Sequence, residues 1–424
     1  MVVESWLARA AREHPGRAAV NEVSYAELHE RARALAAGLP RGGRVGLAFR
    51  PGVEYVVALH AALLAGALVV PVDLRLTAAE RPAVEVLLEP GHPPAAPGAV
   101  RRGVREVHDL AAPAILVHTS GTTSAPKPIR LTYGNWLWSA LGSAVALGVD
   151  PHERWLCTLP LSHVGGLSIL LRSAIYGTTA IVHERFETDR VLAALRDPAG
   201  PTIVSLVPTT LARLLDAGLQ RPPALRWALL GGAPLPPALL ARAAAAGVPV
   251  APTYGLTEAC SQVATGGIPL FCTRVTLAAD GEIVVSGPTV SPDAGAADGV
   301  LPTGDLGAFD EQGRLHIVGR KADTIVTGGE NVAPAEVEAV LEAHPAVAEG
   351  ASWAGPTRSG ERPWSRWSGC ATARRSRRWT CSPTATITWR GSRSPRTSSW
   401  WRTRCRGPCR ASSCAARWRR DRVR

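Results

Sequence analysis

Hydrophobic and polar positions change their period repeatedly along the chain, and these changes predict an alternation of strands and helices. Short apolar runs predict buried strands, whereas longer stretches with apolar residues three or four positions apart predict helices. Strands are expected at residues 44–49, 68–73, 114–117 and 155–159, and helices at 24–39, 53–65 and 134–147, with alternation continuing to about Leu230. This order is typical of an α/β fold with largely parallel sheets.

Two further features refine this pattern. Ser24 followed by Glu27 predicts a helix start with a capping box, and Thr77 is expected to begin another helix. Between residues 270 and 318 the pattern becomes one of short alternating strands separated by glycine turns. This region predicts a small antiparallel sheet after the parallel part.

Positive charge is concentrated at the C-terminal end of the chain. The formal net charge is +12, but residues 353–424 contain 19 Arg and only two acids, Glu361 and Asp421, so this tail carries +17 and the rest carries −5. The tail also holds eight of the 13 Trp, and no Leu follows Leu341. A folded domain without leucine would be unusual, so we expect the tail to be disordered and the body to be a mildly acidic protein.

Cysteine usage and hydropathy indicate a cytoplasmic protein. Outside the tail only Cys157, Cys260 and Cys272 occur, which fits a reducing compartment better than a disulfide framework. Three tail cysteines have loosely metal-like spacing, but no histidine accompanies them, so a zinc site is not expected. The longest apolar stretch, residues 56–72, is interrupted and too short to span a bilayer, and no targeting segment is expected.

The stretch 113–135 carries the clearest candidate chemistry. Its strand runs into TSGTTSAPK at residues 119–127, where small hydroxylic residues precede Lys127. Backbone N–H groups, hydroxyls and one cation at such a turn suit a polyanion, most simply a nucleotide triphosphate. The turn is not a Walker A loop, because the glycine and lysine spacing does not match. A Ser/Thr-rich surface loop is the alternative explanation.

The same stretch resembles the phosphate loop of the adenylate-forming superfamily, with Ser124 and Pro128 in place of two glycines of the usual pattern. Four later motifs resemble those of the superfamily in the expected order: LPLSHVGGL at 159–167, LLGGAPLPPALL at 229–240, TYGLTEACSQVAT at 253–265, and TGDLG with GRKADTIVTGGENVAPAEVEAVL at 303–341. The resemblance implies an adenylation domain at 1–318, a hinge at 319–323 and the start of a small α+β domain at 324–351, followed by the aberrant tail 352–424.

The resemblance also implies substrates and site residues. ATP, Mg²⁺ and coenzyme A are expected, with Glu258 holding the magnesium ion and Lys127, His163, Thr257 and Glu258 forming the catalytic set. The ATP-binding residues are expected to be Thr119, Ser120, Gly121, Thr122, Thr123, Lys127, Gly231, Gly232, Ala233, Tyr254, Gly255, Thr257, Asp305 and Arg320. The GGEN turn, with Gly328, Gly329 and Glu330, is expected on the coenzyme A side.

Within the superfamily, residues 135–187 and the TEACSQVAT segment are most similar to the 2-succinylbenzoate–CoA ligases of menaquinone biosynthesis. The acid is then expected to contact His163, Gly165, Ser261 and Gln262, because an aromatic dicarboxylate needs polar partners in an apolar pocket. A CoA ligase for another aryl acid or a fatty acid is the nearest alternative. A homodimer is possible.

The resemblance implies a reaction in two steps: the acid attacks the α-phosphorus of ATP to give an acyl-adenylate, and the coenzyme A thiol then displaces AMP. A C-terminal lysine that assists the first step in the superfamily is absent, because Lys127 and Lys321 are the only lysines of the chain. We therefore expect impaired activity.

The tail permits a specific explanation of this loss. When the triplets are read from their third base, codons available for residues 352–367, 390–396 and 404–416 permit LGRPDPEWGEAVVAVV, GFKVPK and LPRTVSGKLLRR. These strings resemble the superfamily's C-terminal domain, in order and in one frame, so a frameshift near Ala351–Ser352 is expected. A basic arm that binds nucleic acid, attached to a nucleotide-binding remnant, is the alternative from another functional class.

Overall fold

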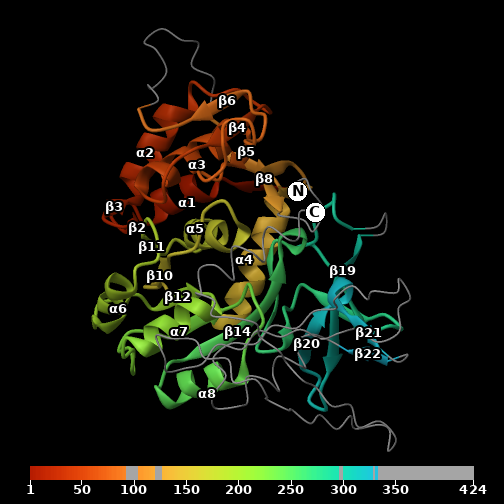
Figure 1. Ribbon diagram of the computed structural model, residues 1–424. Coiled ribbons are helices and arrows are strands. Elements are labelled where there is room, and N and C mark those ends of the chain that lie inside the picture. Colours follow the sequence, from red (N-terminus) through yellow and green to blue (C-terminus); the bar gives the residue numbers. More distant parts are fainter. Residues whose placement is uncertain (92–103, 120–126, 296–298, 328–329, 333–424) are drawn as a thin grey trace, which may run out of the picture. The chain divides into compact units, whose positions relative to one another are not determined.

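A computed structural model of the 424-residue chain describes residues 1–91, 104–119, 127–295, 299–327 and 330–332. These residues belong to two compact units, Met1–Ile317 and the residues from Val318 onward, which are described separately (Figure 1). Within the described residues, no helix is both long and apolar enough to cross a membrane.

A nine-stranded sheet forms the middle of the first unit. Its order is β16-β15-β14-β13-β12-β10-β11-β2-β3, and the strands from β14 to β2 are parallel. The bounds are β2 (Ala18–Val20), β3 (Val23–Ser24), β10 (Arg154–Cys157), β11 (Thr179–Val182), β12 (Ile203–Leu206), β13 (Trp227–Leu230), β14 (Val250–Leu256), β15 (Ser261–Thr265) and β16 (Ile268–Pro269). The strands β3, β15 and β16 at the two edges run antiparallel to their neighbours.

A second sheet has the order β6-β4-β5-β8-β9. It contains β4 (Arg44–Leu47), β5 (Leu68–Pro71), β6 (Val86–Leu88), β8 (Pro113–Thr119) and β9 (Lys127–Thr132), and only β9 is antiparallel. A four-stranded antiparallel sheet follows, with β17 (Arg274–Leu277), β18 (Glu282–Ser286), β19 (Val300–Phe309) and β20 (Leu315–Arg320) in sequence order. The short strands β1 (Val2–Glu4) and β7 (Val107–Asp109) pair separately. The predicted α/β fold and its small antiparallel sheet are confirmed.

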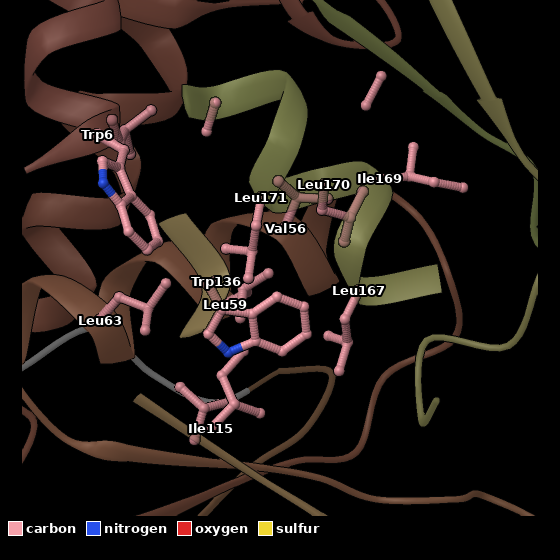
Figure 2. Close-up of a cluster of buried hydrophobic side chains, with 14 of the residues drawn as sticks. Trp6, Val56, Leu59, Leu63, Ile115, Trp136, Leu167, Ile169, Leu170 and Leu171 are labelled. Carbon is pink, nitrogen blue, oxygen red and sulfur yellow. The ribbon is translucent and has the colours of Figure 1, made fainter. Parts of the chain in front are cut away.

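The largest apolar core joins five helices to both parallel sheets (Figure 2). These helices are α1 (Trp6–Glu13), α2 (Tyr25–Ala36), α3 (Val53–Ala65), α4 (Tyr133–Leu147) and α5 (Val164–Tyr176). Figure 2 shows Trp136 among Leu59, Ile115 and Leu167, which come from three other elements. A second core packs α6 (Thr188–Arg196), α7 (Pro208–Asp216) and α8 (Pro237–Ala245) on β10, β12 and β13.

Local signals explain where these helices begin. Ser24 Oγ accepts a hydrogen bond from the Glu27 backbone N–H, as the predicted N-cap requires. At the start of α4, Thr132 and Asn135 form a reciprocal capping box. The helix expected from Thr77 is wrong: Glu80 accepts from the Thr77 backbone and hydroxyl, but only turns follow. Pro82 explains the failure, since it disfavours helical backbone at the preceding residue.

The second unit is described only in its first part. After β20 comes a 3₁₀ turn, η2 (Lys321–Asp323), within the predicted hinge 319–323. A hairpin of β21 (Ile325–Thr327) and β22 (Glu330–Val332) follows, with Thr327 opposite Glu330. The rest of the predicted small domain and the tail 352–424 lie outside the described residues.

Candidate active site

The predicted phosphate loop connects two paired strands. Strand β8 ends at Thr119 and β9 begins at Lys127, and these two residues lie opposite each other in the antiparallel register. Thr119 Oγ1 also donates to the Lys127 carbonyl at 3.3 Å. Lys127 is exposed. Ser120, Gly121, Thr122 and Thr123 lie between these ends and outside the described residues.

Ser291 links the strand after this loop to the predicted magnesium residue. Its backbone N–H donates to the Glu258 carbonyl at 2.7 Å, and its hydroxyl donates to the Arg130 carbonyl in β9, also at 2.7 Å. Arg130 also forms a salt bridge with Asp293, which lies two residues after Ser291 in the sequence. This pairing lowers the pKa of the Asp293 carboxyl. These contacts bring the Lys127 strand and the Glu258 turn into one site.

Thr257 and Glu258 lie in the 3₁₀ turn η1 (Thr257–Ala259), directly after β14. The Glu258 side chain is partly exposed and has no hydrogen bond or ion pair with any residue in the described ranges. Those ranges also contain no group of three His, Cys, Asp or Glu side chains that could hold a metal by themselves. A single available carboxylate fits Mg²⁺, which commonly takes one or two carboxylates and completes its shell with phosphate oxygens and water.

Two predicted adenosine-binding residues contact each other. The Tyr254 hydroxyl donates to Asp305 Oδ2 at 2.7 Å, which joins β14 to β19. Asp305 is only 5% exposed, and its backbone N–H donates to the Thr303 hydroxyl. The buried carboxylate of one predicted ATP-binding residue is therefore held in place by the hydroxyl of another.

The predicted glycines are required by protein neighbours. A β-carbon at Gly231 would crowd the Thr253 hydroxyl and lie 2.9 Å from the Thr253 carbonyl oxygen. Gly232 has φ +80°, which favours glycine. At Gly255 a β-carbon would lie 2.6 Å from the Ser261 carbonyl carbon. The close approach at Gly231 is therefore to Thr253 of the neighbouring strand β14, and Ala233, another predicted ATP-binding residue, is exposed.

Ser261 and Gln262, the predicted acid-binding pair, begin strand β15. Cys260 and Ser261 have φ of 52° and 87°, the left-handed region that non-glycine residues seldom adopt. Gln262 is 3% exposed: its Nε2 donates to Thr265 Oγ1 at 2.9 Å, and its Oε1 has no partner among the described residues. An orphaned buried oxygen of this kind suits a ligand donor or an ordered water.

A buried arginine lies close to this turn. Arg172 of α5 is 2% exposed and forms no salt bridge within the described part of the chain. Its Nη2 donates to Ser139 Oγ at 3.1 Å, its Nε has no described partner, and its guanidinium lies 5.6 Å from the centre of the Trp155 ring. Burial lowers the pKa of Arg172, but a guanidinium stays protonated in proteins, so a positive charge without a described carboxylate lies beside the turn.

His163 is the N-cap residue of α5, and Gly165 is the second residue of that helix. His163 is exposed, but the protein around its ring desolvates it in part, and this lowers its pKa. The nearby Asp73 carboxylate acts in the opposite direction. Gly166 is the glycine of this segment that has the least room for a side chain. A β-carbon added there would lie 3.0 Å from the Pro160 carbonyl carbon. The His163 turn is fixed by Tyr55, whose hydroxyl donates to the Leu161 carbonyl at 2.9 Å.

The remaining predicted residues belong to the second unit or lie outside the described residues. Arg320 belongs to the second unit, which is described by itself. Gly328 and Gly329 lie outside the described residues, and Glu330 is described only as the first residue of β22. No described hydrogen bond joins His163 to Gln262.

Sequence reasoning missed Ser139, Arg172 and Ser291. Arg172 did carry a signal, because it is the one charged residue in the otherwise apolar helix VGGLSILLRSAIY. Ser139 and Ser291 carried none, since each acts through hydrogen bonds to residues far away in sequence.

Comparison with known proteins gives the family of this chain. A family model described as AMP-binding enzyme matches residues 7–88 and 84–292, which is more than half of the chain. The chain belongs to this family of AMP-binding enzymes.

Individual relatives of the chain share a narrower name. 2-Succinylbenzoate–CoA ligase from Bacillus licheniformis is 35% identical over 410 residues, covering 81% of this chain and 85% of the relative. The ligase from Bacillus subtilis is 40% identical over 285 residues, covering 60% and 58%. Among solved structures, the O-succinylbenzoate coenzyme A synthetase of Bacillus subtilis in complex with AMP has a TM-score of 0.78 at 33% identity, covering 85% and 87%. The complex of the same enzyme with the acyl-adenylate intermediate has a TM-score of 0.77 at 32% identity, covering 87% of each chain.

Proposed function

We propose that this enzyme activates 2-succinylbenzoate with ATP and transfers the acyl group to coenzyme A. The observation that carries the proposal is the similarity, at 32% identity and a TM-score of 0.77, to a synthetase solved with the acyl-adenylate. That synthetase has also been solved with ATP and magnesium ion, at a TM-score of 0.78. In the reaction the acid carboxylate attacks the α-phosphorus, pyrophosphate leaves, and the coenzyme A thiol then displaces AMP.

The described residues have distinct tasks in the first step. Lys127 faces the phosphates that leave as pyrophosphate, Thr257 donates to the α-phosphate, and the Asp305 carboxylate accepts from the ribose hydroxyls beside Tyr254. Glu258 would hold Mg²⁺, which when bound reduces the repulsion between the triphosphate and the attacking carboxylate. No side chain here needs to form a covalent bond, so positioning and charge stabilisation dominate the catalysis.

The acid pocket suits a substrate with a second carboxylate. Arg172 offers a buried positive charge without a described carboxylate partner, and Gln262 offers a buried amide close in sequence to Cys260, whose carbonyl accepts from Ser139. A fatty acid would leave that charge uncompensated, which is costly in a buried site. This charge favours the dicarboxylate over the fatty-acid alternative, and His163, Gly165 and Ser261 complete the proposed pocket.

We also propose that the reading frame changes near Ala351–Ser352. The three strings that the shifted codons permit support this proposal, as does the absence of a C-terminal lysine. Sequencing the DNA around Ser352 tests it directly. An unbroken frame there, shared by close relatives of the gene, would exclude the frameshift.

The proposed reaction is tested by measuring pyrophosphate release from ATP with 2-succinylbenzoate or a long-chain fatty acid. We expect release with 2-succinylbenzoate, and replacements of His163 and Gln262 should weaken binding of the acid more than binding of ATP. A preference for the fatty acid would contradict the proposed substrate. The coenzyme A contacts of the GGEN turn and a cytoplasmic location stay predictions. A homodimer stays a possibility, and nucleic-acid binding by the tail stays the alternative that was not favoured.

A further inference from the structure

The turn between Glu258 and Gln262 has an unusual backbone. Cys260 and Ser261 are consecutive non-glycine residues with positive φ. Such residues keep this conformation only when neighbouring contacts hold them there. The turn separates Thr257 and Glu258, which face the nucleotide in the proposed function, from Ser261 and Gln262, which face the acid. A change in its conformation would therefore disturb both halves of the site.

One side chain from a different element holds this turn. The Ser139 hydroxyl, on α4, donates to the Cys260 carbonyl oxygen at 2.6 Å. Ser139 is 1% exposed, so no bulk water can replace it as a donor to this carbonyl. A second hydrogen bond acts inside the turn, because the Cys260 backbone N–H donates to the Thr257 carbonyl at 3.0 Å.

Arg172 determines the direction of the Ser139 hydrogen bond. The guanidinium Nη2 donates to Ser139 Oγ at 3.1 Å and occupies one of its lone pairs, so the hydroxyl proton is directed to Cys260. A cation that donates to a hydroxyl also makes that hydroxyl a stronger donor. The buried chain from Arg172 through Ser139 to Cys260 therefore clamps the strained backbone.

We propose that Ser139 is a positioning residue that maintains the left-handed turn at Cys260–Ser261 and thereby orients Thr257, Glu258 and Gln262. The consequence of this Ser139 hydrogen bond for catalysis rests on the proposed function, whereas its effect on the conformation of the turn does not. Ser139 touches no reacting atom in this account and acts through the Cys260 carbonyl.

The test compares variants of the full 424-residue chain by hydrogen exchange and mass spectrometry. Ser139→Ala removes the donor. Ser173→Ala is the matched control, because the Ser173 hydroxyl is also buried but has no partner among the described residues. Cys260→Gly removes the backbone strain at the residue whose carbonyl Ser139 contacts, since glycine adopts positive φ without cost. The double variant Ser139→Ala/Cys260→Gly shows whether the clamp is needed once the strain is gone.

We expect Ser139→Ala to speed exchange in the peptide 254–265 at least about fivefold, as for an unsatisfied buried carbonyl, with the peptide 203–206 unchanged. Ser173→Ala should leave both peptides unchanged. In the Cys260→Gly background, Ser139→Ala should change exchange by less than about twofold, because the two substitutions are coupled. Three results would each overturn the clamp. They are an unchanged exchange rate of the peptide 254–265 in Ser139→Ala, an equal rise in the exchange rate of the peptide 203–206, and an undiminished effect of Ser139→Ala in the Cys260→Gly background.

A second measurement connects the clamp to the reaction. The parent chain should bind ATP more tightly with Mg²⁺ than without it, and Ser139→Ala should reduce this ratio at least about fivefold, whereas Ser173→Ala should not. A parent chain that does not bind ATP would contradict the proposed function, while the exchange comparison would still decide the clamp. An unchanged ratio in Ser139→Ala, with a parent that binds ATP, would contradict the orienting role.

Discussion

Replacing Gly255 with alanine should damage the nucleotide site through the backbone alone. Gly255 lies in β14 opposite Gln262 of β15, at an irregularity between Tyr254 and Gly255. A β-carbon there would lie 2.6 Å from the Ser261 carbonyl carbon and 3.0 Å from the Gln262 α-carbon, and the Ser261 carbonyl oxygen would be nearer still. Every atom that it meets belongs to backbone, so no side-chain rotation relieves the clash.

The size of the effect follows from this geometry. Carbon atoms in contact prefer about 3.5 Å, so β15 must move away by about 1 Å, which stretches the hydrogen bonds between β14 and β15 beyond their useful length. Overpacking of this kind costs about 1–3 kcal/mol of stability. Because Tyr254 and Gln262 move with the strands, the affinity for ATP with Mg²⁺ should fall at least about tenfold.

The assay is calorimetric titration of the chain with ATP and Mg²⁺, together with urea unfolding. Gly16→Ala is the control, since a β-carbon at Gly16 meets no atom within 4 Å and its φ is not positive. Both measurements should be unchanged in this control. If Gly255→Ala binds ATP as tightly as the parent chain, the contact between β14 and β15 does not position the nucleotide site and the reasoning is refuted.

Three further substitutions or conditions give separate tests. Tyr254→Phe removes the hydrogen bond to the buried Asp305 carboxylate, so ATP affinity should fall about 10-fold, and an unchanged affinity in titration would exclude the pairing as a functional contact. Lys127→Ala should weaken binding of ATP more than binding of AMP, because the proposed function places the lysine charge at the leaving phosphates; equal losses would exclude that role. Burial lowers the pKa of His60 to about 4 and that of His108 to about 3, so the unfolded chain binds more protons than the folded chain below pH 6.5. Stability to urea should therefore fall from pH 6.5 toward pH 4, by up to about 1.4 kcal/mol per pH unit for each histidine. His60→Leu should flatten this slope, and an equal slope in the variant and the parent chain would contradict the assignment.

The sequence predicts elements best where one strong local signal determines them. The helix at 53–65 has the bounds expected, because a continuous apolar run ends at Gly66, which adopts the left-handed conformation of a C-cap. The helix expected from Thr77 fails because Pro82 outweighs the capping signal of Thr77 and Glu80. Residues 6–13 form an amphipathic helix that the apolar pattern did not suggest, and tertiary packing of Trp6 and Leu7 stabilises it.

Some residues of the candidate site could likewise be predicted from the sequence, whereas others could not. Lys127, Tyr254, Glu258 and Asp305 lie in contiguous motifs, so the resemblance of these motifs to the adenylate-forming superfamily predicts their roles in a nucleotide site. Ser291 could not be predicted, because it joins the Lys127 strand to the Glu258 turn by contacts with distant backbone that leave no local pattern. The strained turn at Cys260 was equally hidden, since neither Cys nor Ser signals positive φ.

The most direct test of the central claim is 2-succinylbenzoate-dependent release of pyrophosphate from ATP, measured for the 424-residue chain and for a chain with the reading frame restored at Ser352. The restored chain should release pyrophosphate with 2-succinylbenzoate and not with a long-chain fatty acid. The 424-residue chain should be slower by a factor of roughly 10²–10³, since it lacks a charged donor at the reacting oxygens. No release by the restored chain with 2-succinylbenzoate would contradict the proposed reaction, and equal rates for the two chains would contradict the proposed effect of the tail.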